Sequence, residues 1–451
     1  MANEQLKRTL NLPQLVFYGV GTMVGAGIYS VIGAAAAEAG PRLWLSFIFA
    51  GIAAFLTVLS YAELSAMYPQ TGAEYNFLKQ AFPKRPLFSF MAGYLIALNA
   101  AATAATVALA FAGYLNVFVE LPAPIVALSL LTLCTALNIA GIKEATWVSI
   151  ALICIEVAGL VLLVWSGFES GEMGRSFAAG DAGDGAGAWK AAGIFTATAL
   201  IFFIFIGFED VANLTEETRD PVKTVPRALI VSVLFTSLLY VLVAVAFIAL
   251  SELEGIADSE SPLSAAAATI APWRGQALAV AALFATASTA LISLVSISRM
   301  LFGMARGGHM PELLASTLPA RKTPWVAALA LFAAACLLLP LGEIKIIASV
   351  SSLGVLLVFA AVQAAMITLR LRAPDTDRPF RVAFVVGRVP VLPVIGIGLI
   401  LALLTQFDAI VYGVAGGAML GGLVVYHFIP GPRETTDAEN HKAENDEAHQ
   451  P

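Results

Sequence analysis

Two regions of the sequence place ionisable side chains inside long apolar stretches. Glu156 lies in SIALICIEVAGLVLLV, and Glu209 and Asp210 lie in ALIFFIFIGFEDVANL. A charged side chain at the bilayer centre costs roughly 2.5–3.5 kcal/mol, so such groups are usually functional or face water. These carboxyl groups could bind a proton or a cation. An early helix end before Glu209 would instead place it in solvent, but Val211 and Leu214 continue the apolar stretch.

Glycines mark two places where a membrane helix could break. The stretch GVGTMVGAGIYSVIG contains Gly21, Gly25, Gly27 and Gly33. Gly207 lies at the middle of ALIFFIFIGFEDVANL. A broken helix frees backbone N–H and C=O groups, which can bind charged ligand groups without a charged side chain. The glycine spacing of the first stretch alone also fits close helix–helix packing.

Two interrupted helices about five helices apart indicate an inverted-repeat transporter, because a second copy of an odd-numbered repeat begins on the opposite side of the membrane. The carboxylate of a zwitterion would bind amides where a half-helix begins. Its ammonium would meet carbonyl groups left free at the second break. The predicted carboxylate-binding residues are Gly25, Ala26, Gly27 and Ile28, and the predicted ammonium-binding region surrounds Phe205, Ile206 and Gly207.

Twelve apolar stretches must position these residues. The chain has 451 residues, of which 59% are hydrophobic and 12% charged, whereas soluble domains have about 25% charged residues. Such stretches predict membrane helices, since strands would leave backbone groups unpaired in lipid. The predicted spans are 14–37, 43–67, 87–118, 123–141, 147–168, 191–214, 226–250, 273–304, 324–340, 344–370, 389–406 and 409–429. They form one all-α transmembrane domain over 14–429, between a leader at 1–13 and a disordered tail at 430–451.

Basic residues fall mainly on one side of this arrangement. With the N-terminus inside, 20 of the 25 Lys and Arg residues lie in the leader, at the inner connections or in the tail. The positive-inside rule therefore places both termini in the cytoplasm and the chain in the cell membrane. Arg299 and Arg306, after the eighth span, are expected to contact lipid phosphates and loops. Glu63 and Glu74 are expected to organise an inner loop.

Several other classes of protein fit the sequence poorly. No basic stripe suggests a nucleic-acid surface, and two of the four histidines lie in the tail, so no catalytic cluster or cofactor site is expected in the spans. Cys134, Cys154 and Cys336 lie in apolar stretches, which favours packing over disulfides or metal binding. A receptor or scaffold would need neither broken helices nor a carboxylate in mid-membrane.

Four segments, in this order, resemble the amino acid–polyamine–organocation (APC) superfamily. They are VGAGIYSVIG, SYAELSAMYPQTGAEYNFL, FIGFEDVANLTEETRDPVKTVPRAL and SISRMLFGMARGGHMP. The resemblance covers nearly the whole chain. It implies a five-plus-five inverted repeat with the first and sixth helices unwound, then two further helices, and alternating access for amino acids. The repeats would span about 14–168 and 191–370, and the extra helices about 389–429.

The resemblance also implies roles for individual residues. Ile206 falls where a backbone carbonyl meets the substrate amine, and Glu209 matches a glutamate linked to gating. Phe203 falls where members place an aromatic gate, although lipid-facing bulk would also explain it. Asn99 falls near a position that contacts the substrate side chain in some members. The full predicted substrate site is Gly25, Ala26, Gly27, Ile28, Asn99, Phe203, Phe205, Ile206, Gly207 and Phe208.

Glu156 departs from the family pattern, because many relatives carry a lysine there, whose ammonium takes the place of a sodium ion between helices 1, 5 and 8. A carboxyl group could bind a proton directly, since burial disfavours its ionised form. It could also bind sodium, which prefers oxygen ligands. A neutral glutamic acid that bridges two helices is a third possibility. The other predicted coupling residues are Gly21, Val24, Ser288 and Thr289.

Together these patterns predict a secondary transporter that imports amino acids by proton symport. Sodium symport and amino acid exchange on the same fold are the alternatives. The apolar lining favours neutral substrates or broad specificity. The expected partners are the amino acid, the coupling ion and membrane lipid, with no nucleic acid and no cofactor.

Overall fold

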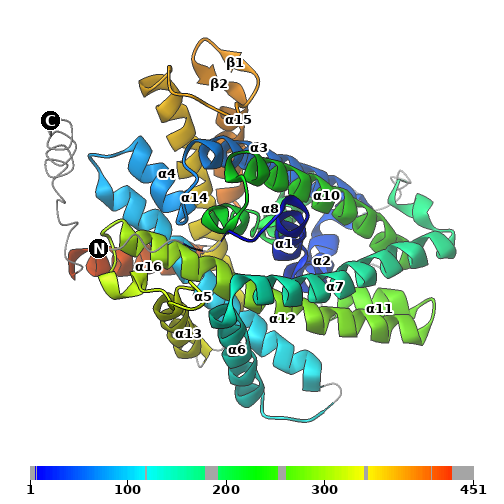
Figure 1. Cartoon of the computed structure of the whole chain (residues 1–451). Helices are drawn as coiled ribbons and strands as arrows, with labels where there is room; N and C mark the ends of the chain where they lie inside the picture. The colour runs from blue at the N-terminus through cyan, green and yellow to red at the C-terminus, as the bar shows by residue number, and fades with distance from the viewer. Residues whose placement is uncertain are drawn as a thin grey trace, which may run out of the picture.

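The computed structural model describes residues 6, 8–116, 119–177, 191–251, 261–339, 344–407 and 409–428. The predicted tail at 430–451 and residues 1–5 and 7 of the predicted leader lie outside this range. Helices dominate the described chain (Figure 1). They are α1 (Leu12–Val24), α2 (Ala26–Ala39), α3 (Leu43–Met67), α4 (Ala73–Ala81), α5 (Pro86–Asn116), α6 (Ala123–Ala140), α7 (Ile142–Ser170), α8 (Ala191–Phe205), α9 (Asp210–Asn213), α10 (Pro221–Leu250), α11 (Pro262–Ala268), α12 (Pro272–Arg306), α13 (Trp325–Leu338), α14 (Ile344–Arg372), α15 (Val391–Leu404) and α16 (Ala409–Phe428). Short 3-10 turns include η3 (Thr215–Glu217), and β1 (Val385–Val386) pairs antiparallel with β2 (Val389–Pro390).

The predicted spans correspond to these helices. Among the described residues, nine segments are long and apolar enough to cross a membrane, and α13 and α15 are shorter apolar helices. The first span is divided into α1 and α2, and the sixth into α8 and α9. The all-α membrane fold with interrupted first and sixth helices is therefore confirmed.

Some helix ends differ from the predicted ones. The seventh span, α10, begins at Pro221, five residues before the predicted start. Proline is favoured in the first turn of a helix because its missing N–H would have no partner there, so the polar first turn of α10 precedes the apolar stretch. The helix α4 and the β1–β2 hairpin lie in connections for which no element was predicted.

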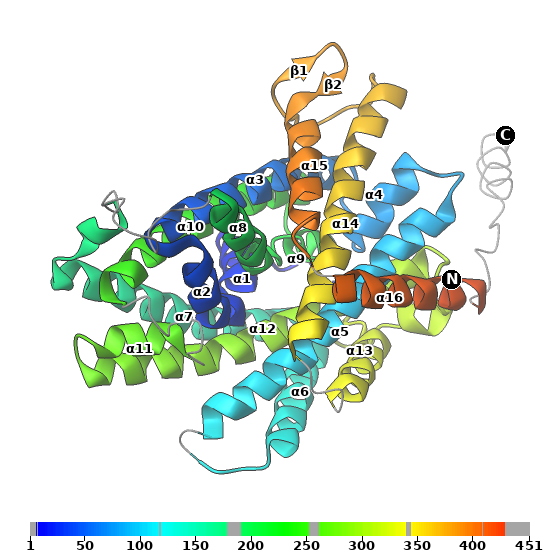
Figure 2. The same cartoon turned by 180° about the vertical axis from the view of Figure 1, so that it is seen from behind.

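Two groups of helices enclose the divided spans. In one group, α10 packs on α3 and α1, and α8 packs on α3 and α2. In the other, α5, α6, α12 and α13 pack on one another, while α7 contacts both α10 and α12. Figures 1 and 2 show α1, α2 and α8 lying between the α3–α10 pair and the α7–α12 pair. The interrupted helices are thus held from two sides.

Arg299 was expected to contact lipid phosphates, and this expectation is wrong, because its side chain is buried within the protein. Its side chain is 0% exposed, and its guanidinium donates to both carboxylate oxygens of Glu217, at 3.0 and 3.2 Å. It also donates to the side chain of Asn138 on α6. Losing one partner of a buried, hydrogen-bonded ion pair strongly destabilises a protein. Arg299 therefore joins α12, α6 and the turn η3, which follows α9.

Other ion pairs secure the side of the molecule that carries most basic residues, called the inner side from here on. Arg306 donates to Glu216 at 2.7 Å, so it too pairs within the protein. Glu63 on α3 is buried and binds Arg370 on α14, while it also accepts the backbone N–H of Val382 at 2.8 Å. These contacts agree with the expectation that Glu63 organises an inner loop.

Glu74 is a buried carboxyl group on α4, outside the membrane spans. Its Oε1 accepts a hydrogen bond from the Tyr61 hydroxyl at 3.1 Å. Burial raises the pKa of Glu74 from its ordinary value of 4.5 to about 7. The folded chain therefore binds this proton more tightly than the unfolded chain, so the stability from protonation is complete below pH 4.5 and is lost as the pH rises through about 7.

Glu74→Gln should flatten this pH dependence, because an amide cannot ionise. Between about pH 5 and pH 8 the wild-type protein should lose up to about 3 kcal/mol of stability from this group, and the variant should not. Thermal unfolding of the purified protein over this pH range measures the effect. Glu120→Gln, which replaces an exposed carboxyl group, should keep the wild-type slope. An equal slope for wild type and Glu74→Gln would contradict the prediction.

Candidate functional site

The first break lies at Gly25, between α1 and α2. Gly25 has φ −42° and ψ −159°, so the helical path stops there and restarts at Ala26. A Cβ atom on Gly25 would lie 2.0 Å from Oγ1 of Thr289, so only glycine permits the observed approach of α12. Gly21 is different, since α1 continues through it and a Cβ there would meet Ile153 at 2.1 Å. The first glycine stretch therefore provides both a break and close packing.

The second break covers residues 206–209, between α8 and α9. Gly207 adopts φ +128°, which side chains other than glycine rarely tolerate. Its N–H donates to Oε2 of Glu209 at 2.8 Å, so the glutamate holds the unwound turn. A Cβ on Gly207 would also lie 2.8 Å from the carbonyl oxygen of Thr22 on α1. Both predicted breaks are confirmed, and they touch each other.

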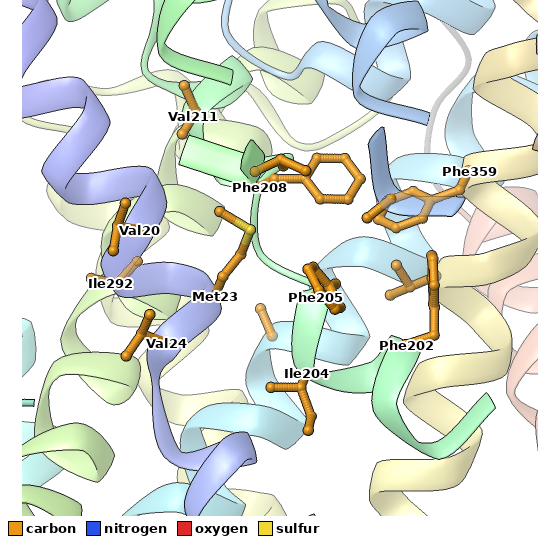
Figure 3. Close-up of a cluster of buried hydrophobic side chains, with 14 of the residues drawn as sticks. Val20, Met23, Val24, Phe202, Ile204, Phe205, Phe208, Val211, Ile292 and Phe359 are labelled. Carbon is orange, nitrogen blue, oxygen red and sulfur yellow. The ribbon is translucent and has the colours of Figure 1, made fainter. Parts of the chain in front are cut away.

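The two breaks bring peptide groups of opposite polarity together. A Cβ on Gly27 would lie 3.7 Å from Ile204, which places the start of α2 against the end of α8. Figure 3 shows Met23 of α1 pointing toward the connection that runs from Phe205 to Phe208. Amides at the start of α2 attract an anion, and α8 ends beside them with carbonyl groups that lack a following helical turn.

Some of the residues at the two breaks are partly exposed, whereas their neighbours are buried. Ala26, Gly27, Phe203 and Ile206 are partly exposed, whereas their neighbours Gly25, Ile28, Phe205, Gly207 and Phe208 are buried. Four of the predicted substrate-binding residues are therefore accessible at the two breaks. The buried aromatic residues pack behind the accessible ones. The Phe205 ring packs edge-on against Tyr240, and the ring centroids of Phe208 and Phe359 are 4.9 Å apart.

Asn99 lies on α5, in the other helix group. It is partly exposed, and its Oδ1 is buried without a hydrogen-bond partner among the described residues. The structure thus leaves an acceptor on α5 unsatisfied. Its contact with a substrate side chain stays a prediction, as does the role of Phe203 as a gate.

Glu156 lies at the centre of α7 and is 0% exposed. Neither carboxylate oxygen has a hydrogen-bond partner in the described part of the chain. Tyr29 of α2 donates to its backbone carbonyl at 2.9 Å, which ties α7 to the divided first span. Ser288 of α12 lies beside this carboxyl group. A proton site, a cation site and a neutral acid that bridges α7 and α12 therefore all stay predictions.

The predicted hydroxyl partners of Glu156 also form hydrogen bonds within their own helix. Ser288 lies next to the carboxyl group but donates to the carbonyl of Ala285 at 3.1 Å. Thr289 donates to the same carbonyl at 2.9 Å and accepts the N–H of Ala26 at 3.1 Å. Among the described residues, no cluster of three His, Cys, Asp or Glu side chains could hold a metal ion. Ligation of sodium by Gly21, Val24, Ser288 and Thr289 stays a prediction.

Tyrosines that the sequence did not single out support the first break. Tyr240 of α10 donates to the carbonyl of Met23 at 2.6 Å, and Tyr18 of α1 donates to the carbonyl of Ile292 at 3.1 Å. Tyr240 satisfies a carbonyl group that the interruption leaves without its helical partner. In the sequence, Tyr240 shows only that a hydroxyl group lies in an apolar stretch. This does not identify its partner, Met23, which is 217 residues away.

Glu209→Ala should slow transport more than it weakens substrate binding. The Glu209 side chain holds the turn at Gly207 and is not expected to contact the substrate. We expect turnover to fall about tenfold, as for the loss of one buried hydrogen bond. Equilibrium binding and initial uptake rates, measured on the same preparation, separate the two effects. Glu209→Gln keeps an acceptor and should fall between wild type and alanine. Equal losses in binding and rate would indicate a direct substrate contact.

Comparisons with known proteins show similarity to transporters over most of the chain. A family model described as amino acid permease matches residues 10–429. An uncharacterised transporter of Mycobacterium tuberculosis is 31% identical over 425 residues, covering 94% of this chain and 91% of the relative. The branched-chain amino acid permease BcaP of Bacillus subtilis is 28% identical over 460 residues, covering 94% and 93%. The vacuolar cationic amino acid transporter 2 of Arabidopsis thaliana is 30% identical over 397 residues, covering 82% and 61%.

The match spans both breaks and both helix groups, so it concerns the whole site and not one segment. The chain therefore belongs to the amino acid permease family of the APC superfamily.

Proposed function

We propose that this protein imports neutral amino acids across the cell membrane by alternating access, coupled to protons through Glu156. The observation that carries the proposal is the contact of two helix breaks. It places the amides at the start of α2 beside the carbonyl end of α8, as a zwitterion requires. The accessible side chains next to these groups are apolar, which supports a neutral substrate.

The arrangement of helices supports alternating access. The divided spans pack with α3 and α10, whereas α5, α6, α12 and α13 form the other group. On the inner side, the pairs Arg299–Glu217 and Arg306–Glu216 connect the two groups. Opening toward that side would require these pairs to separate. The repeat bounds of 14–168 and 191–370, and cytoplasmic termini, belong to the same proposal.

Uptake by proteoliposomes tests the function. The purified protein is reconstituted, and uptake of labelled L-alanine, L-leucine, L-arginine and L-glutamate is measured with and without an inward pH gradient or sodium gradient. We expect accumulation of L-alanine or L-leucine only with the pH gradient. Stimulation by sodium alone would replace the proton with sodium as the coupling ion. Uptake only into vesicles preloaded with an amino acid would indicate an exchanger, and no uptake of any of the four would refute the proposal.

A further inference from the structure

The helix that begins at the first break receives its cap from a distant part of the chain. Gly25 is the N-cap residue of α2, and it has no side chain that could cap this end. Instead, Oγ1 of Thr289 on α12 accepts the N–H of Ala26 at 3.1 Å. The same hydroxyl donates to the carbonyl of Ala285 at 2.9 Å, which fixes its orientation. Thr289 thus performs the role that Ser or Thr usually performs at an N-cap.

The fit between Thr289 and the break is close. The hydroxyl lies 2.0 Å from the position that a Cβ of Gly25 would occupy, so even alanine at this position would displace it. Both Ala26 and Thr289 are partly exposed. A ligand that arrives at the amides of α2 therefore meets a hydroxyl group already bound there.

We propose that the Thr289 hydroxyl caps α2 while the site is empty and gives up the Ala26 N–H to the carboxylate of an arriving substrate. This inference rests on the proposed function, because it assumes that the carboxylate binds at the start of α2. Binding then exchanges one hydrogen bond for a stronger, charge-assisted one. The net affinity is lower than for an uncapped helix, because the binding-competent state is only part of the population. A moderate affinity allows the substrate to leave on the other side.

The cap itself is tested without a ligand, by hydrogen–deuterium exchange of the empty protein in lipid nanodiscs. Thr289→Val removes the acceptor and keeps the side-chain shape, so the amide of Ala26 should exchange about fivefold faster, as expected for a lost cap. Thr289→Ser should exchange as wild type does. Thr286→Val is the matched control, because the Thr286 hydroxyl donates within α12 to Leu283 at 2.7 Å and caps no other helix. Unchanged exchange in Thr289→Val would overturn the proposal.

The competition is tested by equilibrium binding of labelled L-alanine, L-leucine and L-arginine to the same variants. For whichever of these binds wild type, Thr289→Val should bind roughly threefold to tenfold more tightly, whereas Thr289→Ser and Thr286→Val should stay within about twofold of wild type. Weaker binding by Thr289→Val would make Thr289 a substrate ligand and overturn the proposal. If Thr289→Val does not fold, Thr289→Ala serves in both measurements.

The two measurements separate failure of this inference from failure of the proposed function. If none of the three amino acids binds wild type, the proposed function fails, while the exchange rates still decide whether Thr289 caps α2. If substrate binds and Thr289→Val gains no affinity, the proposed function stands and the competition is refuted.

Discussion

Gly27→Leu should abolish substrate binding and leave a folded protein. The nearest atoms to a Cβ at this position belong to Ile204 of α8, at 3.7 Å, which is ordinary van der Waals contact. The remaining carbons of leucine would have to enter the partly exposed region between α2 and α8, where the carboxylate is proposed to bind. Hydrogen bonds to a charged group are worth about 1.5–3 kcal/mol each. Blocking the amides should therefore weaken binding at least about a hundredfold.

Graded variants make this expectation specific to the site. Gly27→Ala adds only the tolerated Cβ and should weaken binding much less than leucine. Gly113→Leu is the matched control, because Gly113 on α5 is exposed and a Cβ there would meet no atom within 4 Å. Binding of a labelled amino acid is compared with thermal stability for all three. Wild-type affinity in a stable Gly27→Leu protein would place the substrate elsewhere.

Local patterns in the sequence predicted the divided helices well. Glycines at 25 and 207 interrupt apolar stretches of membrane length, and each interruption is where the helix stops. The cost of a buried carboxylate likewise identified Glu156 and Glu209, and both are buried. These predictions succeeded because each depends on residues close together in the chain and on the properties of lipid.

Partners across long sequence distances could not be predicted in the same way. Counting basic residues indicates which side of the membrane Arg299 is near, but not that Glu217 and Asn138 enclose it. The hydroxyl of Thr289 was predicted to serve a cation, and its hydrogen bond to an amide 263 residues away was not predicted. Helix packing decides such contacts, and a single sequence contains no direct measure of it.

Glu156→Gln should remove the dependence of uptake on the driving ion. The carboxyl group is 0% exposed, and burial of the ionised form is costly unless a proton or a bound cation balances its charge. Glutamine resembles the protonated acid in shape and cannot change its charge. Substrate should therefore still bind and equilibrate, but not accumulate. With one proton per substrate, a pH gradient of one unit drives about tenfold accumulation in wild type, which should fall to about onefold in the variant.

Three further measurements decide what the lost dependence means. Glu169→Gln removes a carboxylate from the exposed outer end of the same helix, where it pairs with Arg274 at 2.7 Å, and should accumulate substrate as wild type does. Glu156→Asp keeps an ionisable group and should keep a reduced gradient dependence. Repeating the assay with a sodium gradient shows which ion the wild-type carboxyl group serves, because glutamine removes the response to either one. If Glu156→Gln still accumulates substrate tenfold, the carboxyl group does not couple transport, and its burial must be explained by the packing of α7 against α1 and α12.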